Sequence, residues 1–469
     1  MQKKICFSSI FDLTQVQYEQ ATRLQARGHI CYWITTNPKW TRWLLTKNID
    51  RSYILELNPE SLSSLDNKLI HKTIAEIVKI EGDFSRTLNI EFMADRFINN
   101  NKIPNINNLA IHFFYQLKKF LIGNSIDLVF GEPTNFNELL TLFICKSIKI
   151  PFITPQDLRI PENRFFFELY GTGRMVSSGS YDLTTPGADL INDFRKTKEH
   201  PKYFYLLNNN KIKVNKIFKK FKNRFSIIGT KNSHTTHHYF LDRLTENFSQ
   251  IISKFYIKYI FKYSKIDELP EKVAFFGLHV QPENSIDVAG PFFSDQLKLI
   301  KDIRRSLPFD TALVVKEHPN FLGQKGISFF YKLKKIPNVY VLSPYTSTFE
   351  IFGKSSLILT VSGTIAYEGG LLNIPTIIFT KQFFNGFSSI HYCPDISMLK
   401  ALSFRLLDRK PSLDLDADNE FYESIYRYSY EGYWTDPHTD ESVMSMENIE
   451  ALFVGFLDVV ERVDLSKFK

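Results

Sequence analysis

The chain has 469 residues, more than a single hydrophobic core usually serves, so two domains are expected. Hydrophobic residues make up 43% and charged residues 23%, a composition that excludes a disordered or fibrous chain. The net charge of +8 is compatible with nucleic acid, an anionic membrane or an anionic substrate as partner.

Residues 1–160 alternate strand-like and helix-like segments, which is typical of a Rossmann-like domain. Strands are predicted at 3–10, 29–35, 126–130 and 150–154, and helices at 15–27, 107–122 and 137–147. No G-x-G-x-x-G follows the first strand, so a dinucleotide site is not indicated. Asp12 and Glu132 directly follow predicted strands, where open α/β sheets bind ligands.

Residues 161–270 are predicted to form a helical insert rich in basic and aromatic residues. Between residues 195 and 265, seventeen Lys and Arg residues accompany three acidic ones. Apolar residues recur at helical spacing over 240–263, and two interpretations remain open. The helix either packs on a core, surrounded by snorkelling lysines, or lies on an anionic membrane surface. His234 and His238 are four residues apart but lack the H-E-x-x-H pattern, so no metal is expected.

Residues 271–410 are predicted to form a second Rossmann-like domain, and 411–469 a helical tail that packs back on the first. Strands are expected at 273–277, 312–315, 339–342, 357–361 and 374–379, with helices at 294–306, 329–335, 349–354 and 365–372. Polar residues stand at the strand ends within 311–379, which indicates a site for a nucleotide sugar.

The turn after the strand at 312–315 contains His318-Pro319. Because proline fixes the turn, the imidazole of His318 is held at the strand end and can donate to a phosphate. The alternative is a histidine that only caps the turn. Lys316 adds positive charge, and Glu317 is expected to point the other way. Ser343 ends the next strand and is a further donor-binding candidate.

The segment Ser362-Gly363-Thr364 lies between a predicted strand and a predicted helix. Its hydroxyls, its glycine and the free N–H groups of the helix suit a phosphate. Glu368 lies one turn into this helix. It is predicted either to accept from ribose hydroxyls or to act as a first-turn acid that favours the helix dipole.

The polar loop LHVQPENSID follows the strand at 273–277 and holds Gln281, Glu283 and Asp287. Glu283 or Asp287 is predicted to contact the sugar or to stabilise positive charge on it; the alternative is a solvated loop. Sugar transfer with inversion needs a general base, for which Glu283 is preferred, followed by Glu132 and Asp12. A retaining reaction also needs a nearby carboxylate.

The segments FFGLHVQPENS, KEHPN, PNVYVLSP and TVSGTIAYEGGLLNIPTIIF resemble GT-B glycosyltransferases of bacterial capsule and lipopolysaccharide biosynthesis, relatives of Kdo transferases and bacterial sialyltransferases. The resemblance implies two Rossmann-like domains facing a cleft, with the donor on the second and the acceptor on the first. In these enzymes a His-Pro motif and a Ser-Ser or Ser-Thr motif bind a CMP-sugar. His318-Pro319 matches the first motif, and Ser362-Gly363-Thr364 matches the second with an intervening glycine. Gln281–Asp287 resembles their Gln/acid motif at a different spacing.

The resemblance implies a glycosyltransferase with a CMP-activated 3-deoxy-ulosonic or nonulosonic acid as donor and a surface polysaccharide or glycolipid as acceptor. Alternatives are a UDP- or GDP-sugar glycosyltransferase and a UDP-sugar epimerase. No metal, no cofactor and no nucleic acid are expected, although a nucleic-acid-binding protein is a third hypothesis for the basic insert. Without a signal peptide or a long apolar run, we expect a cytoplasmic protein with peripheral membrane contact through residues 195–265.

Overall fold

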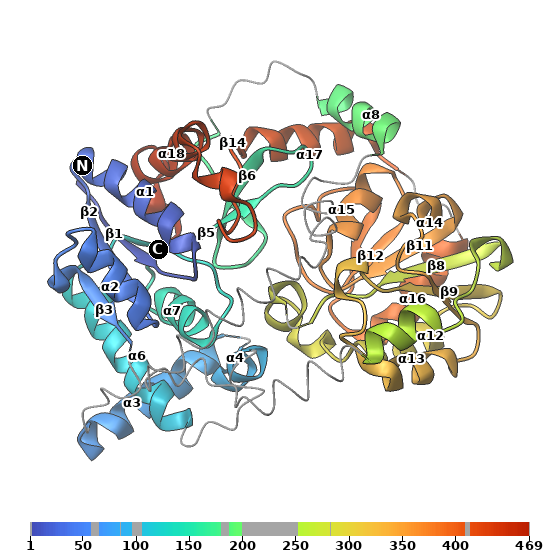
Figure 1. Ribbon diagram of the computed structural model, residues 1–469, viewed down its shortest axis with the longest axis horizontal. Helices are drawn as coiled ribbons and strands as arrows, with labels where there is room; N and C mark the ends of the chain where they lie inside the picture. Colours follow the sequence, from blue (N-terminus) through green and yellow to red (C-terminus); the bar gives the residue numbers. More distant parts are fainter. Residues whose placement is uncertain are drawn as a thin grey trace. The chain divides into compact units, whose positions relative to one another are not determined.

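A computed structural model describes residues 2–57, 65–84, 86–95, 106–179, 187–198, 252–281, 283–408 and 413–468. They form two compact units (Figure 1). Unit 1 contains the described residues up to 179 and those from 427 onward, and unit 2 contains residues 187–198 and the described residues from 252 to 426. The first unit is therefore built from both ends of the chain.

Unit 1 is organised on an eight-stranded sheet with the order β14-β6-β5-β4-β1-β2-β3, and β7 pairs with β6. The strands are β1 Lys4–Ser8, β2 Ile30–Thr35, β3 Ile54–Glu56, β4 Leu128–Phe130, β5 Phe152–Asp157, β6 Arg164–Leu169, β7 Arg174–Val176 and β14 Tyr430–Glu431. The first five strands run parallel, while β6, β7 and β14 pair antiparallel. Parallel strands are covered on both faces, which explains their near-continuous apolar sequences.

Two hydrophobic clusters lie on opposite faces of this sheet, because side chains alternate along each strand. Helices α1 and α18 cover one face, and α3, α6 and α7 cover the other (Figure 1). The helices of unit 1 are α1 Leu13–Ala26, α2 Pro38–Thr46, α3 Asn67–Asp83, α4 Leu88–Ala94, α6 Ile106–Gly123, α7 Phe136–Ser147 and α18 Met446–Glu461.

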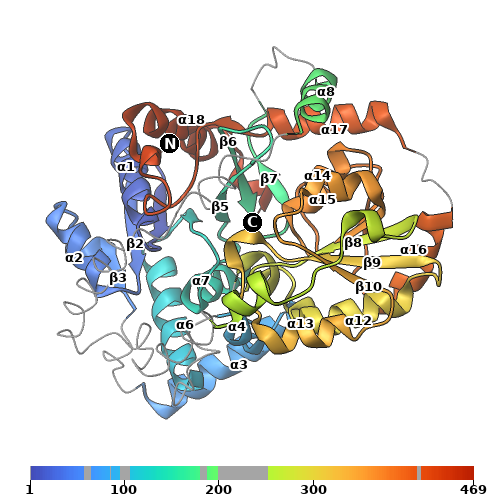
Figure 2. The same ribbon diagram turned by 45° about the vertical axis from the view of Figure 1, so that its right-hand side comes forward.

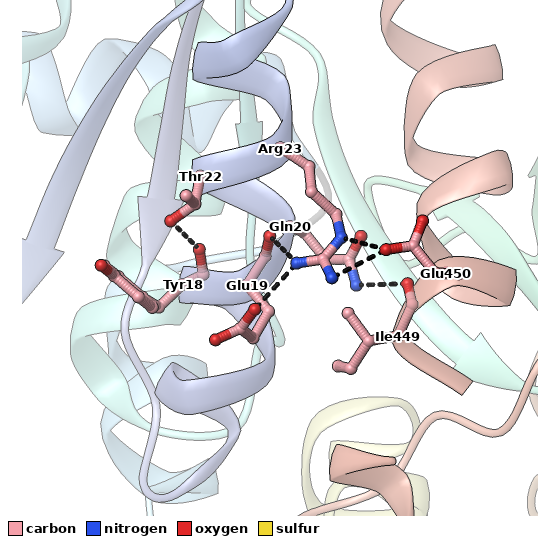
Figure 3. Close-up of polar contacts among 7 residues, drawn as sticks. All are labelled: Tyr18, Glu19, Gln20, Thr22, Arg23, Ile449 and Glu450. Atoms are coloured by element: carbon pink, nitrogen blue, oxygen red, sulfur yellow. Dashed lines mark hydrogen bonds and ion pairs between the residues drawn. The ribbon is translucent and has the colours of Figure 1, made fainter. Parts of the chain in front are cut away.

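Polar contacts join α1 to α18 across more than four hundred residues of sequence (Figure 3). The guanidinium of Arg23 donates to Glu450 Oε1 at 3.0 and 2.8 Å and to Glu19 Oε2 at 2.8 Å. The side-chain amide of Gln20 donates to the carbonyl oxygen of Ile449 at 3.2 Å. The last long helix of the chain is thus fastened to the first.

Unit 2 is organised on a six-stranded parallel sheet with the order β10-β9-β8-β11-β12-β13. The strands are β8 Lys272–Gly277, β9 Thr311–Lys316, β10 Val339–Leu342, β11 Ser355–Thr360, β12 Thr376–Ile378 and β13 Ile390–Tyr392. Its helices are α8 Gly187–Thr197, α12 Gln296–Ser306, α13 Gly326–Lys334, α14 Thr348–Lys354, α15 Thr364–Leu371, α16 Ile396–Asp408 and α17 Leu415–Arg427.

Helices cover both faces of this second sheet as well. Figures 1 and 2 show α12, α13 and α16 on one face and α14 and α15 on the other, in agreement with the two core clusters of the unit. The expected α/β class with two parallel-sheet domains is therefore confirmed. The carboxyl ends of β8, β9, β10 and β11 lie along one edge of the second sheet, where the predicted donor residues follow.

The structure corrects the expected insert at residues 161–270. Residues Arg164–Leu169 and Arg174–Val176 form β6 and β7 of the first sheet. The alternation of RFFFEL places Phe165 and Phe167 in the unit 1 core. The expectations for residues 199–251, including most of the basic segment and His234 and His238, fall outside the described residues.

The tail expected at residues 411–469 is divided between the units. Helix α18 lies on unit 1, whereas α17 packs within unit 2 up to residue 426. The backbone N–H of Ser388 donates to Asp418 Oδ1 at 2.6 Å, and the rings of Phe387 and Phe421 are 5.2 Å apart. Asp418 is thus a buried acceptor. Among the described helices, none combines the length and apolarity needed to cross a membrane.

Candidate functional site in unit 2

In the second sheet, the direction in which successive strands are added reverses at β8. Strands β9 and β10 follow on one side of it, and β11, β12 and β13 lie on the other. In an open α/β sheet, ligands bind outside the carboxyl ends of the strands at such a switch point, because the flanking loops diverge there. The loops after β8 and β11 therefore frame the candidate site, with the loops after β9 and β10 beside it.

Gln281 organises the loop after β8. Its Nε2 donates to Asp287 Oδ1 and to the Ser294 carbonyl, both at 2.9 Å. Its Oε1 accepts from Gln296 Nε2 at 2.6 Å and from Lys325 Nζ at 3.3 Å. Two donors and two acceptor positions are what a primary amide offers. Gln281 thus holds the loop in shape, and its predicted contact with a donor stays a prediction.

Asp287 and Glu283 have different surroundings in this loop. Asp287 Oδ2 accepts from the backbone N–H of Glu283 at 2.9 Å, so both Asp287 oxygens serve the loop itself. Glu283 is exposed, and the Ser285 hydroxyl donates to its Oε2 at 2.6 Å. Of the two acids weighed for contact with the sugar, Glu283 is the one that presents a carboxylate to solvent.

The loop after β11 packs closely against the loop after β8. The Ser362 hydroxyl, on a residue only 7% exposed, donates to the carbonyl oxygen of Ser285. Gly363 precedes α15, and a Cβ there would lie 3.2 Å from His279 Cε1 and 3.2 Å from Thr360 Oγ1. A side chain at position 363 would therefore fit only if these neighbours shifted by a few tenths of an ångström. The predicted contact of a phosphate with the N–H groups of the first turn of α15, beginning at Thr364, stays a prediction.

His279 lies buried between these two loops. Its Nε2 accepts from the Val361 backbone N–H at 3.1 Å and lies 2.9 Å from Thr360 Oγ1. Burial lowers the pKa of His279 to about 3, and the charge of Lys325 acts in the same direction. The imidazole is therefore neutral and joins the ends of β8 and β11.

Lys316 ends β9 and points toward the segment before α14. Its Nζ donates to the Thr346 carbonyl and to Thr348 Oγ1, both at 2.8 Å. Burial lowers the pKa of Lys316 to about 8, against the attraction of the Glu368 carboxylate. Lys316 thus fastens two strand ends together, and a contact with the donor stays a prediction.

Glu317 and Lys325 interact electrostatically next to this lysine. Glu317 is buried, and burial raises its pKa to about 8, while Lys325 and the backbone N–H of Gly323 act to lower it. Burial lowers the pKa of Lys325 to about 8, and the carboxylates of Glu317, Asp287 and Glu283 act to raise it. Lys325 therefore faces three acids from two loops.

The remaining predicted donor residues lie at the same edge of the sheet. Pro319 begins a short 3-10 turn, and the half-buried ring of His318 packs edge-on against Phe321 with ring centroids 5.7 Å apart. Ser343 Oγ accepts from the Tyr345 backbone N–H at 3.3 Å. Glu368 is buried in α15, and its carboxylate attracts the ammonium of Lys316. Their predicted contacts with phosphate and ribose stay predictions.

The switch point of unit 1 lies between β1 and β4. Asp12 follows β1, and its Oδ1 lies 3.5 Å from Lys39 Nζ. Glu132 follows β4 and is half-buried. Both predicted carboxylates therefore stand on the loops that frame this second switch point, where the acceptor was expected.

Asp157 is a further acid of unit 1, at the end of β5. Burial raises its pKa to about 7; Arg159 acts to lower it and Glu162 to raise it. A carboxyl group that titrates near neutrality suits a general base. The sequence pointed to none of Asp157, His279 and Lys325. His279 contacts Thr360 and Val361, and Lys325 interacts with Glu283 and Asp287, which lie far from them in sequence. Proximity to a predicted strand end was the available signal for Asp157 and His279.

No group of three His, Cys, Asp or Glu side chains suited to a metal occurs among the described residues. No protein-family model matches the chain, and no curated protein matches it.

Three of the solved structures that are similar to the chain are the following. A Methanocaldococcus jannaschii UDP-GlcNAc 2-epimerase in complex with UDP-GlcNAc and UDP is 14% identical, covers 91% of this chain and 100% of its own, and has a TM-score of 0.27. The Thermosulfurimonas dismutans β-Kdo 2,7 transferase KpsC is 11% identical over 77% and 98%, with a TM-score of 0.31. Acinetobacter baumannii MurG is 10% identical over 94% and 98%, with a TM-score of 0.27. These similarities assign no family.

Proposed function

We propose that the chain is a glycosyltransferase that moves a sugar from a nucleotide-sugar donor to a carbohydrate or glycolipid acceptor. The observation that carries the proposal is the arrangement at the switch point of unit 2. The ammonium of Lys325 interacts with the exposed carboxylate of Glu283 and with Glu317, the residue before the His318-Pro319 turn. The loop that carries Glu283 also accepts a hydrogen bond from Ser362, which lies directly before the N-terminus of α15.

This arrangement suits the charges that develop during glycosyl transfer. The departing nucleotide carries growing negative charge on its phosphate, for which the α15 N–H groups and His318 are candidate donors. The sugar develops positive charge, as in glycoside hydrolysis, and the exposed Glu283 carboxylate is the candidate for stabilising it. Asp12, Glu132 and Asp157 of unit 1 are the candidates for activating the acceptor hydroxyl.

The preferred donor is a CMP-activated 3-deoxy-ulosonic or nonulosonic acid, on the basis of the His-Pro resemblance. The acceptor is proposed to be a surface polysaccharide or glycolipid at the inner face of the membrane. Residues 252–265 support membrane contact. Ile257 and Phe261 enter the core, while Phe255, Tyr259 and Ile260 are exposed. The lysines at 254, 258, 262 and 265 add positive charge for an anionic surface.

The donor is tested by thermal shift with CMP, CDP, UDP and GDP, because at equal concentration the ligand with the lowest dissociation constant stabilises the folded chain most. His318→Ala is expected to lose affinity for the stabilising nucleotide by calorimetry, and His71→Ala, an exposed histidine of α3, serves as the matched control. Unchanged affinity in His318→Ala would refute the assignment of the phosphate site.

The reaction is tested by product analysis with the stabilising nucleotide's sugar conjugate, with and without acceptor glycans. A transferase transfers the sugar to the acceptor. Glu283→Gln is expected to lower the rate of this transfer by a larger factor than it lowers the affinity for the nucleotide. Conversion of a UDP-sugar to its epimer without acceptor would show an epimerase instead.

A further inference from the structure

Two buried polar atoms at the ends of β9 and β10 lack hydrogen-bond partners within the described part of the chain. Glu317, directly after β9, is 3% exposed, and its Oε2 has no partner. The hydroxyl of Tyr263 is also buried and has no partner. Leaving a buried polar group without a hydrogen bond is energetically unfavourable. A hydrogen bond from a ligand that reaches either atom would therefore be stabilising.

The two residues flank the end of the same strand. Leu342 of β10 is in register with Lys316 of β9, the residue before Glu317. On its other side Leu342 bridges Ser264, the residue after Tyr263, and the Ser264 N–H donates to Val341 at 2.9 Å. The groups are close enough that the Glu317 carboxylate, after burial, raises the pKa of Tyr263.

An aromatic ring stands beside this pair. Tyr345, in the turn after β10, is 64% exposed, and its charge also acts on the pKa of Tyr263. An acceptor, a hydroxyl donor and an exposed ring together match a nucleobase, which presents hydrogen-bonding atoms along its edge and a face for stacking. A sugar hydroxyl would use the polar pair but not the ring.

We propose that Glu317, Tyr263 and Tyr345 form the subsite for the base of the donor nucleotide. Glu317 Oε2 accepts from a base N–H, the Tyr263 hydroxyl donates to the adjacent base acceptor, and Tyr345 stacks on the ring. For cytosine these atoms are N4–H and N3; for uracil they are N3–H and O4. The inference rests on the proposed function, because it assigns specificity within that same nucleotide site.

The experiment is calorimetric titration of the full chain with CMP, UMP and ribose 5-phosphate, which lacks a base. Tyr263→Phe is expected to weaken binding of the preferred nucleotide about tenfold, the contribution of one hydrogen bond, and to leave ribose 5-phosphate unaffected. Glu317→Gln and Tyr345→Ala are expected to show the same selective loss. Tyr331→Phe, on α13, is the matched control and should bind like the unaltered chain.

Stability gives a second readout that a merely structural role would not produce. Because the Tyr263 hydroxyl is unsatisfied without ligand, Tyr263→Phe should keep or raise the thermal midpoint of the free chain while it weakens nucleotide binding. Equal loss for nucleotide and ribose 5-phosphate, or no loss for either, would overturn the base subsite. Failure of the unaltered chain to bind any nucleotide would overturn the proposed function as well. Preference for CMP or UMP in the unaltered chain identifies the base.

Discussion

The buried carboxyl group of Glu317 makes the stability of the chain depend on pH in a direction that can be measured. An unfolded glutamate loses its proton near 4.5, whereas the folded one keeps it to about 8. Between these values the folded state binds more protons, so the free energy of unfolding falls as pH rises. Glu317→Gln removes this titration and should leave a flatter profile.

The magnitude follows from the shift. A change from 4.5 to about 8 corresponds to at most about 5 kcal/mol at one site. Relaxation around a buried group recovers part of such a cost, so we expect about 2–4 kcal/mol. At pH 8 the variant should be the more stable protein, and its advantage should shrink progressively as the pH is lowered toward 5.

The assay is urea unfolding of both proteins across this pH range, with the difference in free energy taken at each pH. Titrating groups that do not interact with Glu317 contribute equally to both proteins and cancel in the difference, whereas the coupled titration of Lys325 stays part of the measured effect. Glu350→Gln, an exposed acid in the first turn of α14, is the control and should give a difference independent of pH between 6 and 8. Parallel profiles for Glu317→Gln and the unaltered chain would refute the reasoning.

Three further predictions concern unit 1 and the exposed aromatic segment. Because Asp157 must be ionised to act as a base and titrates at about 7, transfer rates should rise through neutral pH, and Asp157→Asn should abolish that rise; an unchanged pH–rate profile would exclude it. Replacing Phe255 and Tyr259 by Ser should reduce sedimentation with anionic vesicles, more so at high salt, whereas Phe404→Ser on α16 should not; equal binding would count against membrane contact. The Arg23–Glu450 pair, with side chains 17% and 60% exposed, should contribute about 0.5 kcal/mol in a double-mutant cycle, and a coupling above about 2 kcal/mol would contradict a screened surface pair.

The strands of both sheets were predictable where their sequences are short, apolar and bounded by turns. The segments at 273–277, 312–315 and 339–342 each became a buried or partly buried parallel strand. β6 was missed although RFFFEL is strongly apolar, because it adjoins the basic segment that was taken for a helical insert. Its antiparallel pairing with β5 follows a turn containing Arg159 and Asn163, both with positive φ, which no glycine announces in the sequence.

The sequence predicted where the candidate site lies in the second sheet, but it predicted the contacts of the individual side chains less well. Because His318, Ser362 and Gln281 follow predicted parallel strands, their position at one edge of the sheet could be predicted. The directions of Lys316 and Glu317 were not predictable, because Lys316 is held by Thr346 and Thr348, some thirty residues away. Glu317 was expected to point the other way from Lys316, and it interacts electrostatically with Lys325.

The union of α1 and α18 in a single core has a consequence for biosynthesis. The strands β1–β5 of unit 1 leave the ribosome before the strands of unit 2, but one face of their sheet is covered in part by residues 446–461, which are made after those strands. Unit 2 lies wholly between these segments, so all its strands are available before unit 1 can be closed. Domains generally fold in the order of their synthesis; here the unit begun first is completed last, and a chain released before residue 446 would expose an apolar sheet face.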